Sequence, residues 1–171
     1  SEAPVMLFVG RVRPYKNVVS LVQTFRQWKR SAARLVVAGN PVSDDLGGRV
    51  QAAAEGDARV RTTLRFIEED EMPALIAGAD LVVLPYESIM HSGSALLALS
   101  YDRPILVPDR GAMTELRARV GRDWVRTYTG ELTPSVLAEG MAARAPVEDL
   151  DWPRLARQTV ALYRRVLEAH D

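Results

Sequence analysis

The chain has 171 residues, of which 47% are apolar and 26% charged, as is typical of one globular domain with a sizeable core. Its 22 basic and 22 acidic residues cancel, so no global field favours nucleic acid or an anionic membrane as a partner. The absence of cysteine excludes disulfides and thiolate metal sites, and it fits a reducing compartment. No apolar run is long enough to span a bilayer and no signal peptide is visible. We therefore expect a single cytoplasmic domain over residues 1–171.

Short apolar runs alternate with helical patterns along the whole chain, which predicts an α/β fold. Strands are expected at residues 5–9, 34–38, 59–66, 81–84, 105–107 and 124–127, with the polar third strand nearer an edge. Helices are expected from residue 18, with Asn17 as its N-cap, and over about 43–55, 68–77, 93–101, 114–120, 134–144 and from 151 onward. This alternation favours right-handed βαβ units in a Rossmann-like, doubly wound parallel sheet.

The stretch from residue 80 to 99 organises the predicted site. An apolar strand stops at Pro85, a polar loop follows, and Ser92-Gly93-Ser94 opens an apolar helix. Gly93 lets backbone approach a ligand, and the free N–H groups of a helix start attract an anion. A strand, a small-residue turn and a helix together predict a phosphate site, although an ordinary helix cap explains the same pattern.

Four loops should meet at the carboxyl ends of the strands, at residues 10–16, 39–41, 86–94 and 108–111. The first loop, which starts at Gly10, carries Arg11, Arg13 and Lys16, which can neutralise phosphate oxygens. Opposite the helix start at Ser92, these cations would complete a diphosphate clamp. The alternative is that they are solvated loop charges.

Other polar residues allow both a binding role and a purely structural one. His91 can contact a phosphate or sugar group of a ligand or be merely exposed, and Glu87 has the same ambiguity. Glu115 suits the first turn of a helix after a Gly turn, and the acids at 68–71 suit a solvated helix start. The chain contains no dinucleotide GxGxxG after the first strand, no Walker phosphate loop, no HExxH and no nucleophile elbow.

Taken together, these segments resemble the C-terminal, donor-binding half of a GT-B glycosyltransferase of family 4, the glycosyl transferases group 1. The resemblance is carried by FVGRVRPYKNV, LVVAGNP, LRFIEEDEMPALIAGADLVVLPY, RPILVPDRGAMTEL and DWPRLARQTVALYRRVL, in that order. It covers nearly the whole chain.

The resemblance implies a role for each matched residue in binding a nucleoside-diphosphate sugar. Arg11 and Lys16 match the family's Arg and Lys that neutralise the donor diphosphate and support catalysis. The other matched positions would contact the donor: Gly10 and Gly39 in the two Gly loops, Ile67 where backbone meets the base, the His91, Ser92, Gly93 and Ser94 turn, and Glu115. The implied reaction transfers a sugar to an acceptor hydroxyl, with retention and without a metal or other cofactor.

One departure from the family pattern weakens the match. The family usually carries two glutamates seven residues apart, and the corresponding positions here are Ile89 and Leu97. Leu97 cannot accept a hydrogen bond from a ribose hydroxyl, so ribose must be held by other groups. A second hypothesis follows: a non-catalytic nucleotide-sugar or protein-interaction module that kept the fold.

The partner expected from the resemblance is a second, acceptor-binding domain of the same enzyme, which this chain lacks. We therefore expect the 171-residue chain to be inactive alone, and any membrane association to come from that missing half. A third possibility, a generic flavodoxin-like binding domain, leaves the cations of the 10–16 loop unexplained.

Overall fold

The computed structural model describes residues 3–29, 32–88 and 93–143. Within these residues six strands form one fully parallel sheet in the order β3-β2-β1-β4-β5-β6. The strands are β1 (Val5–Val9), β2 (Arg34–Ala38), β3 (Val60–Thr63), β4 (Leu81–Val83), β5 (Ile105–Pro108) and β6 (Val125–Tyr128). The strand order reverses direction between β1 and β4, and such a switch point is where open α/β sheets bind ligands. The Rossmann-like sheet expected from the sequence is confirmed.

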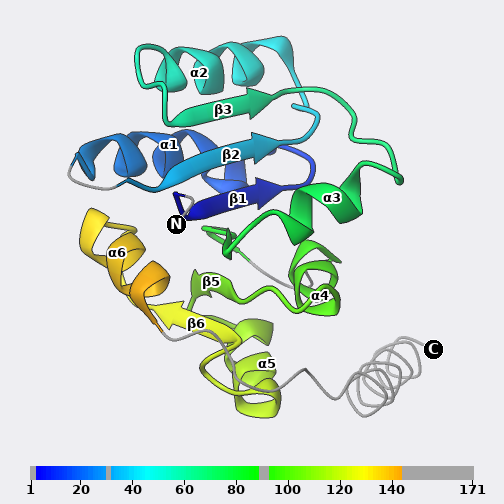
Figure 1. Ribbon diagram of the computed structural model, residues 1–171, viewed down its shortest axis with the longest axis vertical. Coiled ribbons are helices and arrows are strands. Elements are labelled where there is room, and N and C mark those ends of the chain that lie inside the picture. Colours follow the sequence, from blue (N-terminus) through cyan, green and yellow to red (C-terminus); the bar gives the residue numbers. More distant parts are fainter. Residues whose placement is uncertain (1–2, 30–31, 89–92, 144–171) are drawn as a thin grey trace.

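Helices follow the strands and cover both faces of the sheet. They are α1 (Val18–Gln27), α2 (Asp44–Ala54), α3 (Met72–Ala77), α4 (Gly93–Ser100), α5 (Ala112–Val120) and α6 (Pro134–Ala142), with a short 3₁₀ helix, η1 (Pro14–Lys16). Helix α1 packs against α2 and α6, while α3, α4 and α5 pack against β1, β5 and β6 respectively. Figure 1 shows α2 beside β3 at one end of the molecule and α5 beside β6 at the other.

The core lies on both sides of the central strands because these strands are apolar at consecutive positions. Every residue of β4 and β5 is buried, and so is β1 from Met6 to Val9. Strand β3 is only half-buried, as its polar alternation predicts for an edge strand. None of the helices in the described part of the chain combines the length and the apolar character needed to cross a bilayer.

Three local expectations differ from the structure. The third strand ends at Thr63, not at residue 66, and α3 begins at Met72, so the acids at 68–71 precede the helix. Glu71 forms an ion pair with Arg65 at 2.6 Å. The expected final helix lies outside the described residues.

The third difference concerns Asn17, which does not cap α1 with its side chain. Its backbone is left-handed (φ 53°), and its side-chain amide donates to the carbonyl of Pro85 at 3.3 Å. The residue therefore joins the loop after β1 to the loop after β4. By contrast, Thr133 caps α6 with its side chain, because its hydroxyl accepts from the N–H of Val136 at 3.3 Å.

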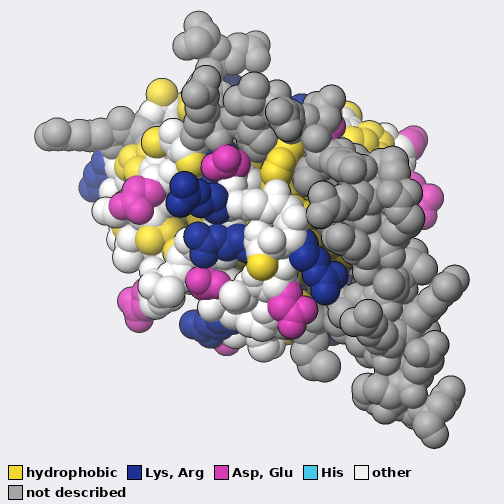
Figure 2. All heavy atoms as spheres, turned by 90° about the horizontal axis from the view of Figure 1, so that it is seen from below, with side chains coloured by type: hydrophobic (Ala, Val, Ile, Leu, Met, Phe, Trp, Pro, Cys, Tyr) yellow, Lys and Arg dark blue, Asp and Glu magenta, His cyan; other side chains and the backbone are white. Residues whose placement is uncertain are grey.

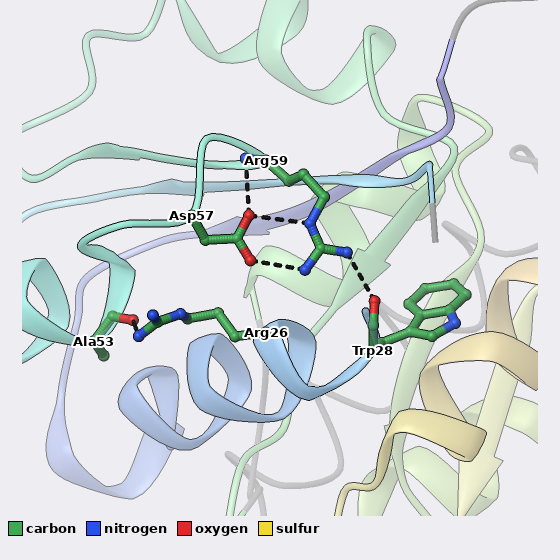
Figure 3. A network of polar contacts seen from close by, with 5 residues as sticks. All are labelled: Arg26, Trp28, Ala53, Asp57 and Arg59. Carbon is green, nitrogen blue, oxygen red and sulfur yellow. Dashed lines mark hydrogen bonds and ion pairs between the residues drawn. The ribbon is translucent and has the colours of Figure 1, made fainter. Parts of the chain in front are cut away.

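A polar network holds the opposite end of the sheet, away from the predicted site (Figure 3). Asp57 accepts two hydrogen bonds from the Arg59 guanidinium, at 3.0 Å to Nε and 2.7 Å to Nη2. Arg59 also donates to the carbonyl of Trp28 at 2.7 Å and lies over the Phe25 ring. The hydrogen bond from Arg59 lowers the pKa of Asp57. The network fixes the end of α1 to the start of β3, so it supports the fold and not the site.

Candidate functional site

The loop after β1 is held in a tight path that ends at Lys16. Gly10 has a φ of 130° and donates to the carbonyl of Ala38 at 3.0 Å, so the chain turns across the end of β2. Val12 then pairs with the 40–42 segment through two backbone hydrogen bonds of 2.9 and 3.0 Å. The η1 turn and left-handed Asn17 follow. This path places the side chain of Lys16 back over Gly10.

Gly10, Lys16 and Ser94 come together at the switch point of the sheet. A Cβ built on Gly10 would lie 2.7 Å from the Ser94 hydroxyl and 3.4 Å from the Lys16 ammonium. Lys16 and Ser94 are far apart in sequence, but their loops follow the neighbouring strands β1 and β4. We refer to these three residues as the Gly10 cluster. It joins a cation, a bare stretch of backbone and the first turn of α4, which is the combination predicted for binding phosphate.

The ammonium of Lys16 is half-buried. Burial lowers the pKa of Lys16, and the nearby positive charge of Arg13 lowers it further. Burial removes water from the ammonium, so an anion that binds beside it stabilises the charged form of Lys16. The electrostatics of the loop therefore favour an anionic ligand at the Gly10 cluster.

Tyr86, which sequence reasoning placed only in a polar loop, lies against Lys16. The Lys16 ammonium is 5.1 Å from the centre of the Tyr86 ring, and the Tyr15 ring meets the Tyr86 ring edge-on at 6.1 Å. Tyr86 is 3% exposed. The only sequence signal for it is an aromatic residue directly after the Pro85 that ends the β4 segment. The N–H of Glu87 donates to the carbonyl of Tyr15 at 2.8 Å and ties the two loops together.

Gly39 acts on the cluster through backbone packing. It is buried with a φ of 153°, and a Cβ at this position would lie 1.9 Å from the carbonyl oxygen of Gly10. A side chain at residue 39 would therefore push the Gly10 turn away from Lys16. The structure supports a part for Gly39 in shaping the site, while direct contact with a ligand stays a prediction.

Three other residues predicted for the site, Arg11, Gly93 and Glu115, are exposed. Arg11 follows Gly10 and is exposed, whereas Glu115 is exposed on the first turn of α5, after β5. Gly93 is exposed at the start of α4, and a Cβ there would meet no atom of the described residues within 4 Å. His91 and Ser92 lie outside the described residues. Their expected contacts with a ligand therefore remain predictions from the sequence.

The segment around Ile67 is held rigidly beside the carboxyl end of β3. The Ile67 side chain is buried, and Phe66 beside it is 62% exposed. Arg65 forms a two-point ion pair with Glu71, at 2.8 and 2.6 Å, and Glu71 also accepts from the N–H of Glu68 at 3.0 Å. These contacts lower the pKa of Glu71 to about 2. These contacts hold the backbone next to Ile67 in place, while contact of this segment with a base stays a prediction.

A polar cavity of about 510 Å³ lies next to the cluster, between α1 and the loops after β4, β5 and β6. Its wall includes Tyr86 and Glu87, and Arg110 crosses it to donate to the carbonyl of Glu87 at 3.1 Å. Tyr128 also lines it, and burial raises the pKa of that phenol to about 12, so its hydroxyl keeps the proton. The cavity therefore offers both neutral and charged hydrogen-bonding groups next to a candidate site for an anion.

At the α5 end of the molecule, basic and acidic side chains balance each other, unlike at the Gly10 cluster, where the charged side chain is the Lys16 ammonium. Figure 2 shows basic and acidic side chains interspersed on this face. A second cavity there, of about 550 Å³, is lined by three arginines and three acids: Arg117, Arg122, Arg126, Asp109, Asp123 and Glu139. Arg117 and Asp109 form an ion pair at 3.6 Å. Because these charges balance, the face is a weaker candidate for an anionic ligand than the Gly10 cluster.

Comparison with known proteins identifies the family. A family model described as glycosyl transferases group 1 matches residues 3–143. The chain belongs to this family. A GDP-mannose:glycolipid 4-beta-D-mannosyltransferase from Xanthomonas campestris is 36% identical over 96% of the chain, which corresponds to 48% of that protein. A 2-deoxystreptamine glucosyltransferase from Streptomyces kanamyceticus is 28% identical over 79% of the chain and 32% of its own length.

Solved structures agree on the fold of this family member. Sucrose-phosphate synthase from Thermosynechococcus elongatus aligns with a TM-score of 0.67 and 21% identity, over 98% of the chain and 46% of that protein. The glycosyltransferase AviGT4 aligns with a TM-score of 0.62 and 20% identity, over 98% of the chain and 52% of its own. The chain therefore has the architecture of a GT-B C-terminal domain, and it spans about half the length of several curated relatives that it matches.

Proposed function

We propose that this domain binds the diphosphate of a nucleotide-sugar donor at the Gly10 cluster, within an enzyme that transfers the sugar to an acceptor hydroxyl. The observation that carries the proposal is the meeting of Gly10, Lys16 and Ser94 at the switch point between β1 and β4. Family membership supports the reaction type. The domain would supply donor binding, while acceptor binding and closure of the cleft would need a second domain.

The chemistry of the leaving group explains why a cation is needed at this point. When the glycosidic bond breaks, negative charge builds up on the diphosphate oxygens. The Lys16 ammonium and the positive N-terminal end of the α4 dipole are fixed in place before the reaction, so they stabilise this charge with little rearrangement. Arg11 would add a second cation by turning its exposed side chain over the bound phosphates. The proposed mechanism uses these groups in place of a metal ion.

We propose GDP-mannose as the first donor to test, because the X. campestris relative is named for it. That name also specifies a 4-beta linkage, whereas the family resemblance implies retention. The anomeric configuration of the product is therefore the sharpest test of the stereochemical expectation. A β-linked product formed from an α-linked donor would contradict retention.

A second candidate function is a non-catalytic module that kept the fold. The observation that favours it is Leu97, which stands where the family usually has a ribose-binding glutamate. Leu97 is half-buried on α4 and packs against the core. Ribose binding by this side chain is therefore excluded, and other groups must hold the sugar of the nucleotide.

A transfer assay with the full-length protein that contains this chain separates the two functions. We expect transfer from one donor among GDP-mannose and UDP-, ADP- and TDP-glucose to a glycolipid acceptor, with activity kept in the presence of EDTA. Arg11→Ala and Lys16→Ala should each lower it strongly. Binding of a donor without transfer by the full-length protein would favour the non-catalytic module, and loss of transfer in EDTA would contradict metal independence.

A further inference from the structure

We propose that Tyr86 is a positioning residue for Lys16: its ring holds the ammonium over Gly10, facing the donor diphosphate. The inference rests on the proposed function and gives a role of its own to Tyr86, which the sequence placed only within the 86–94 loop. The distance of 5.1 Å from the ammonium to the ring centre is within the range of a cation–π contact.

The charge of Arg13, on the same loop, acts on the Lys16 ammonium and repels it. No ion pair of Lys16 with a residue of the described ranges offsets this repulsion. The aromatic face therefore supplies the attraction that keeps a half-buried cation in place. A ring is suited to this task because it attracts the ammonium without neutralising it, so the full charge remains for the ligand.

Tyr86 is itself fixed from several sides. It is buried, it contacts Tyr15 edge-on, and its neighbours are bonded to the Lys16 loop on both sides. Asn17 donates to the carbonyl of Pro85, and Glu87 donates to the carbonyl of Tyr15. The ring is thus a rigid platform that is locked to the segment carrying Lys16.

The test uses aromatic rings at position 86 that have nearly the same shape but a progressively weaker negative electrostatic potential on the ring face. Tyr86→Phe keeps the aromatic face, and phenylalanines carrying one, two and three fluorines at position 86 weaken it stepwise. Because the shape of the side chain changes little, folding should be retained throughout the series. Tyr86→Leu, which removes the ring, is a coarser companion variant.

The first readout is the titration of Lys16 itself, in the absence of any ligand. The sequence contains two lysines, Lys16 and Lys29. NMR of the chain labelled with ¹³C-lysine therefore gives two signals, and exposed Lys29 serves as an internal reference. The proposal predicts that the pKa of Lys16 falls with each added fluorine, because the ring stabilises the charged form, while the Lys29 signal titrates unchanged. An unchanged Lys16 titration across the series would overturn the contact.

The second readout is the affinity for a nucleoside diphosphate, measured by calorimetry with GDP, UDP, ADP and TDP. We expect Tyr86→Phe to bind like the wild type, and the most fluorinated ring and Tyr86→Leu to bind about three- to tenfold more weakly. In the Lys16→Ala background the same changes at position 86 should have no effect. If the pKa of Lys16 falls along the series while the diphosphate affinity stays unchanged, the positioning role of Tyr86 is overturned. If the wild type binds no diphosphate, the proposed function is overturned, and the NMR series alone decides whether Tyr86 contacts Lys16.

Discussion

At the scale of single residues, the most informative group is Lys16, because its charge is half-buried before any ligand arrives. Burial and Arg13 lower its pKa, so the ammonium loses its proton at a lower pH than an exposed lysine does. We expect diphosphate affinity to weaken as the pH rises through this lowered pKa. Lys16→Arg, whose guanidinium stays charged, should remove that dependence. Calorimetric titrations from pH 7 to 10 check this, and an identical pH profile in the Arg variant would count against it.

Single residues also show what the sequence could and could not predict about the site. Lys16 and Ser94 could be placed together because both follow strands whose carboxyl ends meet at one edge of a parallel sheet. The left-handed Asn17 and the contact between Lys16 and Tyr86 could not, because each depends on how two loops distant in sequence pack against each other. The preference of Asn for helix N-caps and the presence of a tyrosine at position 86 do not say which distant loop each residue contacts.

At the scale of elements, the loops after β1 and β2 depend on the absence of a side chain at Gly39. Gly39→Ala should lower the free energy of unfolding by about 3 kcal/mol or more, because its Cβ would collide with the carbonyl of Gly10. Gly48 within α2 is the matched control, since a Cβ there meets no atom of the described residues within 4 Å. Gly48→Ala should raise the free energy of unfolding by about 0.5–1 kcal/mol. Urea denaturation measures both, and equal effects would refute the predicted collision.

The contact between Asp57 and Arg59, which joins the end of α1 to the start of β3, predicts how the free energy of unfolding depends on pH. Asp57→Asn should lower the free energy of unfolding by about 1–3 kcal/mol at pH 7, because it removes the two-point contact with Arg59. The pKa of Asp57 is lowered in the folded state, so its contribution is present above the ordinary carboxyl pKa and is lost as the pH falls through the lowered value. The two proteins should therefore converge in stability as the pH falls below this lowered pKa. A constant difference from pH 7 to 2 would contradict this account.

The strands and helices themselves were largely predictable, for a physical reason. Central strands buried on both faces need unbroken apolar runs, so β1 and β2 begin and end where the sequence predicts. The third strand and α3 were predicted too long. Leu64 and Phe66 extend the alternating pattern of β3, and the acids at 68–71 are typical of a first helical turn, but in the structure Arg65 pairs with Glu71 between the two elements. Short edge elements are fixed by such contacts more than by periodicity.

At the scale of the whole molecule, the chain spans about half the length of its curated mannosyltransferase relative. We expect the 171-residue chain alone to bind a nucleoside diphosphate and to transfer no sugar. Donor binding would need the Gly10 cluster, whereas transfer would also need an acceptor held opposite to it. Calorimetry measures diphosphate binding and a product assay on the same preparation measures sugar transfer. Sugar transfer by the 171-residue chain alone would disprove the expectation that transfer needs a second domain.

The most direct test of the central claim is a titration of the 171-residue chain with GDP, UDP, ADP and TDP at low salt. We predict that one diphosphate binds, that Lys16→Ala weakens this binding by about 2–3 kcal/mol, and that Lys29→Ala, which removes the other lysine, leaves it unchanged. Equal binding by the wild type and Lys16→Ala would contradict the assignment of the diphosphate to the Gly10 cluster.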